Sequence, residues 1–107
     1  MTDGGSRGLN PRFVKLVKAD APYKWKVVLK DESSGRERTV RFGRQPYEDY
    51  TIHKDEVRKE RYISRHQKRE DWTKSGIFTA GFWSRWLLWN KPTIRGSLKD
   101  VRERFSI

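Results

Sequence analysis

The sequence predicts an α+β fold, in which a small antiparallel sheet of about three strands is followed by about three helices. Residues 11–43 alternate apolar and charged side chains, which is the pattern of half-buried strands. Residues 44–107 change to helical spacing, with capping residues and a proline that stops a helix. We therefore expect a flexible N-terminal arm over residues 1–10 and a single small domain over residues 11–107, strand-rich first and helical afterwards.

Three stretches of the first part have the composition of strands: RFVKLVK (12–18), YKWKVVLK (23–30) and RTVRF (38–42). The turn residues of DESSGRE (31–37) separate the second stretch from the third, so an antiparallel meander that ends at Gly43 is expected. The second stretch is predicted to have an apolar face of Tyr23, Trp25, Val27 and Leu29 and a basic face of Lys24, Lys26 and Lys30.

Three helices are expected after a loop that spans residues 43–54. The first, over 55–71, begins with acidic and ends with basic side chains, as the helix dipole favours, and its few apolar residues place it at the surface. The second contains GFWSRWLLWN (81–90), with Thr79 as its N-cap and Pro92 beyond its end. The third is SLKDVRERF (97–105), with Ser97 as its N-cap and an apolar stripe of Leu98, Val101 and Phe105.

Charge and composition narrow the classes of function. Lysine and arginine number 25 against 14 acidic residues, and this net charge of +11 favours a polyanion or an acidic surface as partner. The absence of cysteine excludes a disulfide framework and thiolate metal sites. No apolar run suggests a signal peptide or reaches the ~20 residues of a membrane span, so neither is expected.

The aromatic segment holds three of the five tryptophans. On a regular helix the side chains of Phe82, Trp83, Trp86, Leu87 and Trp89 occupy an arc of roughly 160°, with Leu88 on the opposite side. This arc is wider than a small sheet needs, so we expect at least two tryptophans in the core and the rest in a docking surface. Stacking of unpaired nucleotides on these rings is the competing interpretation.

The densest basic stretch is RKERYISRHQKR (58–69). On a helix its bases form a ridge that suits phosphates or an acidic protein surface, although a plain solvated face would have the same composition. The ridge consists of Arg58, Arg61, Arg65, Lys68 and Arg69.

No catalytic, metal or cofactor-binding residues are expected. The sequence contains no HExxH motif, no recognisable nucleophile and no glycine-rich phosphate loop. An enzyme centred on His53 and Asp55 is a weak alternative, and a small-molecule substrate is not expected.

From Phe42 to Phe105 the sequence resembles a family of small basic proteins encoded by large nucleocytoplasmic DNA viruses of algae and amoebae. The family pattern is DYT-x-HKD…RY…RH…W…G…TAGF-x-S-x-W-x-LWNKPT…RF, and it has no established activity from which functional residues could be carried over. The first 41 residues lie outside it. In this chain the pattern falls on Asp49, Tyr50, Thr51, His53, Lys54, Asp55, Tyr62, Arg65, His66, Trp72, Gly76, Thr79, Ala80, Gly81, Phe82, Trp86, Trp89, Asn90, Lys91, Pro92 and Thr93.

The resemblance implies a viral protein. We expect a virion structural protein, a minor capsid or cement-type protein that docks between larger capsid proteins through its aromatic helix and basic faces. It would be located in the capsid, and in the host cytoplasm during assembly. The alternative is a nucleic-acid-binding protein associated with viral DNA, which would use the lysines of 24–30 and the basic helix. The expected partner-binding residues are Phe82, Trp83, Trp86, Trp89, Arg58, Arg61, Arg65 and Lys68.

Overall fold

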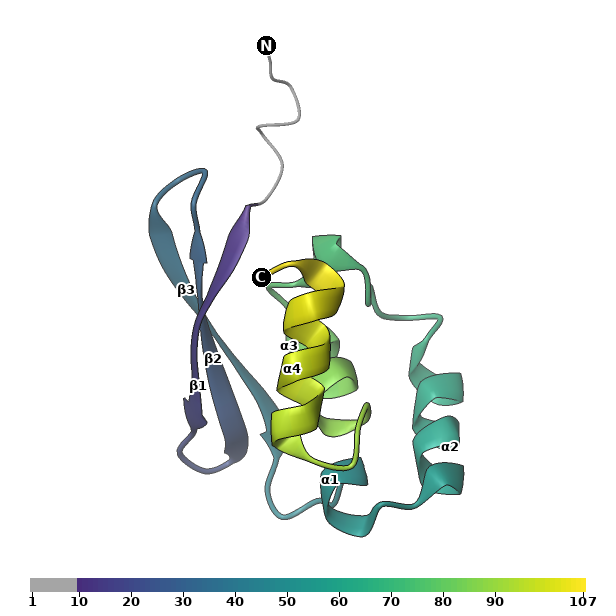
Figure 1. Cartoon of the computed structure of the whole chain (residues 1–107). Helices are drawn as coiled ribbons and strands as arrows, with labels where there is room; N and C mark the ends of the chain where they lie inside the picture. Colours follow the sequence, from purple (N-terminus) through teal and green to yellow (C-terminus); the bar gives the residue numbers. More distant parts are fainter. Residues whose placement is uncertain (1–9) are drawn as a thin grey trace.

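A computed structural model describes residues 10–107 and confirms the α+β prediction, with a three-stranded antiparallel sheet on the N-terminal side and helices after it (Figure 1). The strands are β1 (Pro11–Lys18), β2 (Tyr23–Asp31) and β3 (Arg36–Arg44), side by side in chain order. The predicted arm lies outside the described residues except for Asn10, whose carbonyl oxygen accepts a hydrogen bond from the Glu32 amide at 2.9 Å.

The two faces of the sheet differ in polarity because side chains alternate along each strand. Val27 lies opposite Leu16 and Val40, and Trp25 lies opposite Phe42, so these residues share the inner face. Of the predicted basic residues, Lys26 lies directly opposite Arg41 on the outer face, and Lys30 lies between Arg12 and Glu37. The predicted place of Lys24 on this open face was wrong, because its side chain is largely buried and its ammonium contacts Asp49. Val28 is buried on this outer face, between Lys15 and Thr39 of the neighbouring strands, which the simple alternation did not predict.

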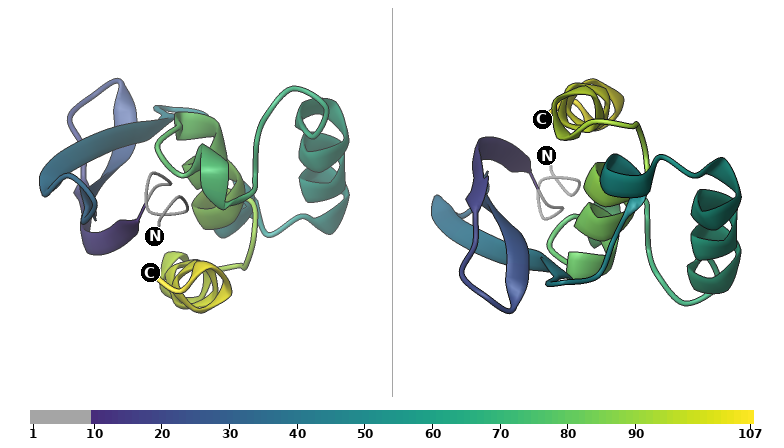
Figure 2. Two further views of the ribbon diagram at one scale, coloured as in Figure 1. Left: turned by 90° about the horizontal axis from the view of Figure 1, so that it is seen from above. Right: turned by 90° about the horizontal axis from the view of Figure 1, so that it is seen from below.

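The helices all lie on one side of the sheet (Figure 2). Of these elements α3 and α4 lie next to the sheet, and α2 is the farthest from it. The elements are α1 (Tyr50–His53), α2 (Glu56–His66), the 3₁₀ turn η2 (Lys74–Gly76), α3 (Ala80–Trp83), the π-helical turn η3 (Ser84–Leu88) and α4 (Ile94–Phe105).

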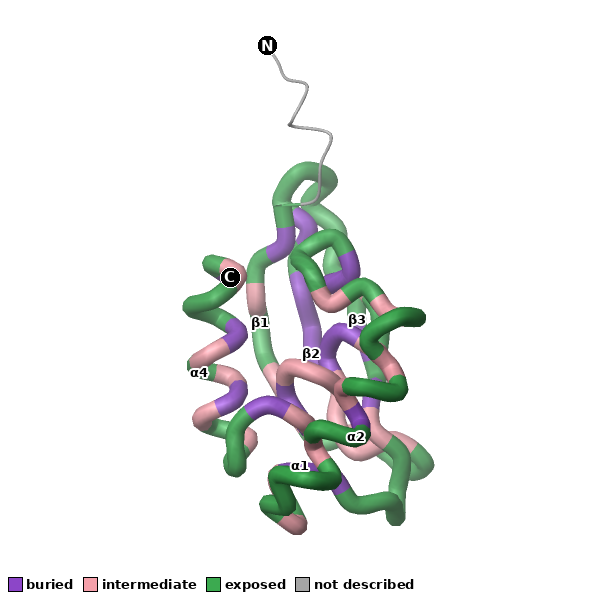
Figure 3. The backbone as a smooth tube through the Cα atoms, turned by 90° about the vertical axis from the view of Figure 1, so that its right-hand side faces the viewer, coloured by how far each residue is buried: buried purple, intermediate pink, exposed green. Residues whose placement is uncertain are grey.

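The core lies between the sheet and the aromatic segment, where Figure 3 shows the buried stretches of β2 and β3. Phe82 and Trp83 are both fully buried, and the Trp83 ring lies 6.3 Å from that of Phe42 on β3, centroid to centroid. The Trp83 indole N–H donates to the Ile77 carbonyl at 2.7 Å, so the ring is buried without an unsatisfied polar atom. Val101 of α4 completes this core, which joins the strand-rich and helical parts of the chain.

The aromatic helix begins as predicted but changes its geometry after one turn. The Thr79 side chain caps α3 by accepting from the Phe82 amide. In η3 the Trp89 amide donates to the Ser84 carbonyl five residues earlier, at 3.2 Å. This wider turn brings Leu88 into the core, so its predicted place on the opposite side was wrong. Gly43 permits the approach, because a Cβ there would lie 3.0 Å from Leu88 Cδ1.

Two predicted boundaries around α2 were wrong. The loop over 43–54 contains the short helix α1, and α2 ends at His66 instead of residue 71. Glu70 explains the second difference, since its carboxylate contacts the His66 ring at 3.3 Å and accepts from the Trp72 indole at 2.9 Å. These contacts turn the chain back toward the core before another helical turn can form.

The last helix starts earlier than predicted. Thr93, not Ser97, is the N-cap of α4, and its side chain accepts from the Gly96 amide. Ser97 is fully buried inside the helix, where its hydroxyl accepts from the Lys91 amide at 2.9 Å. The predicted stripe of Leu98, Val101 and Phe105 does pack against the core. Among residues 10–107, none of the helices has both the length and the apolar character that crossing a bilayer requires.

Truncation of Trp83 is expected to lower the free energy of unfolding by about 3–5 kcal/mol, because Trp83→Ala leaves a cavity beside Phe42 and an unpaired Ile77 carbonyl. Urea denaturation measures this change. Val57→Ala is the control, because Val57 is 57% exposed and its truncation should cost less than about 0.5 kcal/mol. Equal effects of the two substitutions would contradict the assignment of Trp83 to the core.

Asp31 makes the stability dependent on acid pH. The Ser33 hydroxyl donates to its carboxylate at 2.7 Å and the Ser33 amide at 3.1 Å, and the side-chain bond is the main cause that lowers the pKa of Asp31 below 3.8. A pKa that is lowered in the folded state stabilises that state at pH values above the ordinary pKa of an aspartate. This contribution is lost as the pH falls through the folded-state pKa. Asp31→Asn should therefore flatten the fall in stability at acid pH, as measured by urea denaturation at several pH values.

Candidate functional site

The predicted aromatic anchors divide into two groups. Phe82 and Trp83 are fully buried in the chain's own core, so their predicted docking role is corrected to a core role. Trp86 and Trp89 are half-buried. The division arises because the inner face of a sheet this small is closed by the first turn of the aromatic segment, which leaves the later rings at the margin of the core.

The ring of Trp86 is already occupied by contacts within the chain. Its indole N–H donates to the Trp72 carbonyl at 2.9 Å. The guanidinium carbons of Arg85 and Arg104 each lie 4.5 Å from the ring centroid, a cation–π distance. Burial lowers the pKa of Arg85, whose guanidinium also donates to the Trp89 carbonyl at 2.7 Å. Trp86 therefore stabilises the junction of η3 and α4.

Trp89 is the contact through which α2 is attached to the rest of the molecule. Its ring stacks on Tyr62 of α2, with centroids 4.6 Å apart and planes 4° from parallel. On the same helix the Lys59 ammonium donates to the Asn90 carbonyl at 2.7 Å. The His66 ring stacks on Tyr62 as well, at 4.3 Å. Burial raises the pKa of Tyr62, which keeps its phenol neutral within this stack.

The predicted basic residues are all exposed, but they do not all lie on the helix. Arg58, Arg61 and Arg65 lie on α2, whereas Lys68 lies in the turn that follows it, because the helix ends at His66. Arg58 contacts Glu48 at 3.0 Å. No ion pair joins the other three of these bases to any of residues 10–107.

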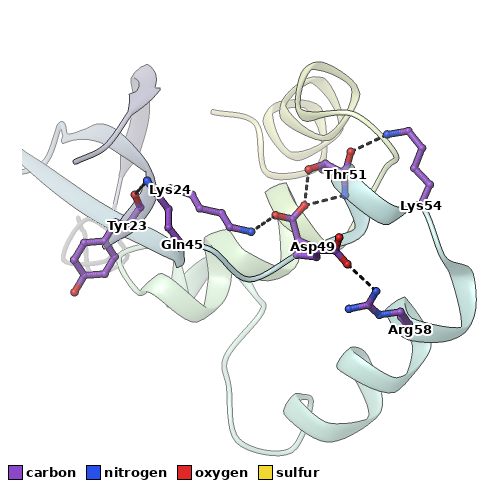
Figure 4. Close-up of polar contacts among 8 residues, drawn as sticks. Tyr23, Lys24, Gln45, Asp49, Thr51, Lys54 and Arg58 are labelled. Atoms are coloured by element: carbon purple, nitrogen blue, oxygen red, sulfur yellow. Dashed lines mark hydrogen bonds and ion pairs between the residues drawn. The ribbon is translucent and has the colours of Figure 1, made fainter. Parts of the chain in front are cut away.

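A buried ion pair fixes the loop that leads from the sheet to α1. The Asp49 carboxylate is almost fully buried and accepts from the Lys24 ammonium of β2 at 2.6 Å. The same carboxylate caps α1 by accepting from the Thr51 amide at 2.9 Å, as Figure 4 shows. One side chain thus connects the start of β2 with the first turn of α1.

The neighbouring loop residues extend this connection to α2 (Figure 4). The Gln45 side-chain amide donates to the Tyr23 carbonyl at 2.9 Å. Glu48 accepts from the Arg58 guanidinium of α2. Between these two anchored residues, the Tyr47 side chain is 71% exposed.

A cleft of about 570 Å³ opens between the ends of β2 and β3, the loop before α1, α2 and the aromatic segment, and we call it the α2 cleft. Beside it lies a smaller hollow of about 300 Å³, and both are lined by Tyr47, Glu48, Arg65 and Trp89. The basic and aromatic side chains that line the α2 cleft include those of Arg41, Arg44, Tyr47, Arg65, His66 and Trp89.

The α2 cleft has a positive net charge. Asp49 and Glu48 form ion pairs with Lys24 and Arg58, whereas Glu70 contacts the His66 ring and the Trp72 indole. The cleft arginines Arg41, Arg44 and Arg65 form no ion pair with any of residues 10–107. This arrangement can attract and hold an anion at the cleft.

His53 and Asp55, the centre of the weak enzyme alternative, have structural contacts. The Asp55 carboxylate caps α2 by accepting from the amides of Val57 and Arg58, and the Asp55 amide donates to His53 Nδ1 at 2.9 Å. The His53 ring lies against Trp89, with centroids 5.3 Å apart. Across the described residues, no three histidine, aspartate or glutamate side chains are grouped as a metal ion would require.

Residues 14–66, just under half of the chain, match the profile of a family of unknown function (DUF5754). The match runs from within β1 to the end of α2, so it contains the Lys24–Asp49 ion pair and the basic helix but not the aromatic segment. No curated protein and no solved structure shows a significant match to the chain. The family description names no activity, partner or organism, and the resemblance to viral proteins stays a prediction.

Sequence reasoning missed Arg41, Arg44 and Tyr47 as candidate site residues. Tyr47 lies in the loop that the Lys24–Asp49 pair fixes, and this pair joins residues 25 positions apart. Arg41 and Arg44 belong to β3 and line the cleft only once the helices pack beside the sheet. One local signal was available, because Asp49 followed two residues later by Thr51 is typical of a helix N-cap. That signal predicts α1, although it does not predict the cleft.

Removal of Asp49 should be much more costly than removal of its neighbour. Asp49→Ala leaves the nearly buried Lys24 ammonium without its counter-charge, and a loss of about 3 kcal/mol in the free energy of unfolding is expected. Glu48→Ala removes an exposed ion pair and should cost less than about 1 kcal/mol. Urea denaturation of both variants measures the difference, and similar losses would contradict the structural role given to Asp49.

Proposed function

We propose that the protein is a non-catalytic binding protein that holds nucleic acid through its basic surfaces. The observation that carries this proposal is the number of exposed cations without counter-charges. Within residues 10–107, ion pairs engage only Arg12, Lys24, Arg58 and Arg104 among the lysines and arginines. Lys59 and Arg85 are partly buried and donate to backbone carbonyls, but most of the remaining bases are exposed. These exposed bases are available to phosphates, whose contacts provide most of the sequence-independent affinity for nucleic acids.

The outer face of the sheet supports the same proposal. No helix of residues 10–107 covers this face, as Figure 2 shows, and Lys26 lies directly opposite Arg41 on it. Like charges at directly opposite positions destabilise a sheet, and a bound anion would relieve their repulsion. Arg41 also lines the α2 cleft, so the basic outer face continues into the cleft and toward Arg65 of α2.

A second candidate is the virion structural protein that the sequence resemblance implies, a minor capsid or cement-type protein. The observation that favours it is an exposed apolar surface away from the aromatic helix. Tyr47 and Ile52 are 71% and 55% exposed, and they line a hollow of about 430 Å³ together with Trp25 and Ile94. Docking on larger capsid proteins would then use this surface instead of the tryptophan-rich segment.

Quantitative mass spectrometry of purified virus particles tests the second candidate. A cement-type protein should co-purify with intact particles in many copies. Detection in infected-cell extract but not in the particles would contradict a structural role in the capsid.

Salt titration tests nucleic-acid binding. In filter-binding assays the logarithm of the affinity should fall linearly with the logarithm of the salt concentration. Combined replacement of Arg61, Arg65 and Lys68 by glutamine should reduce the slope by about 1 for each lost phosphate contact. Lys99→Gln is the control, because Lys99 is an exposed lysine of α4 that lines neither the α2 cleft nor the smaller hollow beside it. A dissociation constant above about 10⁻⁴ M at physiological salt would contradict the proposal.

A further inference from the structure

We infer that the α2 cleft receives an unpaired nucleotide and that the protein prefers single-stranded nucleic acid over a duplex. This inference rests on the proposed function and specifies its ligand. A base within a duplex is stacked and paired, so entry into a cleft requires a strand whose bases are already free.

The cleft offers flat surfaces for a base. Trp89 lines the cleft, and its ring is held in a fixed plane by stacking on Tyr62 and by the His53 ring, whose centroid lies 5.3 Å away. Tyr47 lines the same cleft with 71% of its surface exposed, so its ring is accessible to a stacked base. Aromatic side chains beside a basic groove are the common feature of sites that bind single strands without sequence preference.

The charges lie where a strand leaving the cleft would need them. Arg41 and Arg44 lie at the end of β3, and Arg65 lies on α2 across the cleft, so guanidinium groups are present on two walls. Planar guanidinium groups bind phosphate oxygens through paired hydrogen bonds. Arg61 lines the adjoining hollow with Arg65, which extends the positive surface along α2 beyond the cleft.

The cleft has a suitable size and fixed walls. Its volume of about 570 Å³ is within the range of clefts that bind small flat ligands. One wall is held by the buried Lys24–Asp49 pair. The other is held by the close approach of Glu70 to α3, where a Cβ on Gly81 would lie 2.8 Å from the Glu70 carboxylate. The cleft is therefore present before a ligand binds.

Fluorescence anisotropy with the full chain tests the inference at one fixed salt concentration. Three labelled DNAs of about 12 residues are compared: a deoxythymidine strand, the same strand with several abasic residues, and a duplex. The abasic strand keeps every phosphate but lacks the bases at the abasic positions. We expect it to bind about five- to 150-fold more weakly than the intact strand, and the duplex to bind more weakly than the intact strand as well.

Substitutions at the cleft provide the second measurement. Tyr47→Ala should weaken binding of the intact strand at least about fivefold, whereas Tyr47→Trp should retain it, because the ring and not the hydroxyl makes the contact. Arg44→Gln should weaken all three DNAs. Arg36→Gln is the matched control, because Arg36 is an exposed arginine at the opposite end of the same strand and does not line the cleft. Tyr47, Arg44 and Arg36 are all exposed, so these variants should fold.

The outcomes separate this inference from the proposed function. Equal affinity for the three DNAs, together with no effect of Tyr47→Ala, overturns the inference and leaves nucleic-acid binding in place. No measurable binding of any of them overturns the proposed function itself. Displacement of the strand by an equal concentration of free thymidine monophosphate overturns the assignment of a strand, since it would indicate a site for a small nucleotide.

Discussion

The packing of the first turn of the aromatic segment on the inner face of the sheet is the constraint on which the other features depend. Apolar residues make up 34% of the chain, and 36% are charged, so a core of ordinary size can form only if the aromatic rings are used for it. Phe82 and Trp83 meet this need against Val40 and Phe42. The composition that suggests a surplus of aromatic surface is therefore also the reason that these two rings are buried.

The position of α2 far from the sheet follows from the same small number of apolar residues. After the core is complete, few apolar side chains remain for this helix, and it is attached through the Tyr62–Trp89 stack, the hydrogen bond from Lys59 to Asn90 and the Glu48–Arg58 ion pair. These contacts hold the helix at a distance from the sheet, and the α2 cleft lies between them. A basic helix that packed tightly on the sheet would leave no space for a ligand beside its arginines.

The features that could be predicted from the sequence depend on neighbouring residues. Alternation of apolar and charged residues over 12–42 identifies the three strands, and Thr79 identifies the start of the aromatic helix. Both signals depend only on residues that are close in the sequence. The early end of α2 depends on Glu70 contacting Trp72, the burial of Leu88 depends on a π-helical turn, and Ser97 is buried because Thr93 already caps α4. The cleft depends on Lys24 and Asp49, which lie on different elements. Contacts of this kind are set by the assembled fold, so local patterns do not contain them.

β3 is an edge strand, because only β2 pairs with it in the sheet, and this position has a consequence for how copies of the chain approach one another. An exposed edge strand presents unpaired backbone groups that favour association with another sheet, and charged side chains along the edge oppose it. β3 carries such charges at Arg36, Glu37, Arg38, Arg41 and Arg44. A bound nucleic acid would neutralise the arginines and remove this repulsion. Several chains bound side by side on one nucleic acid would then have their β3 edges within pairing distance. The edge charges of β3 would therefore oppose pairing between free chains more strongly than between chains bound to the same polymer.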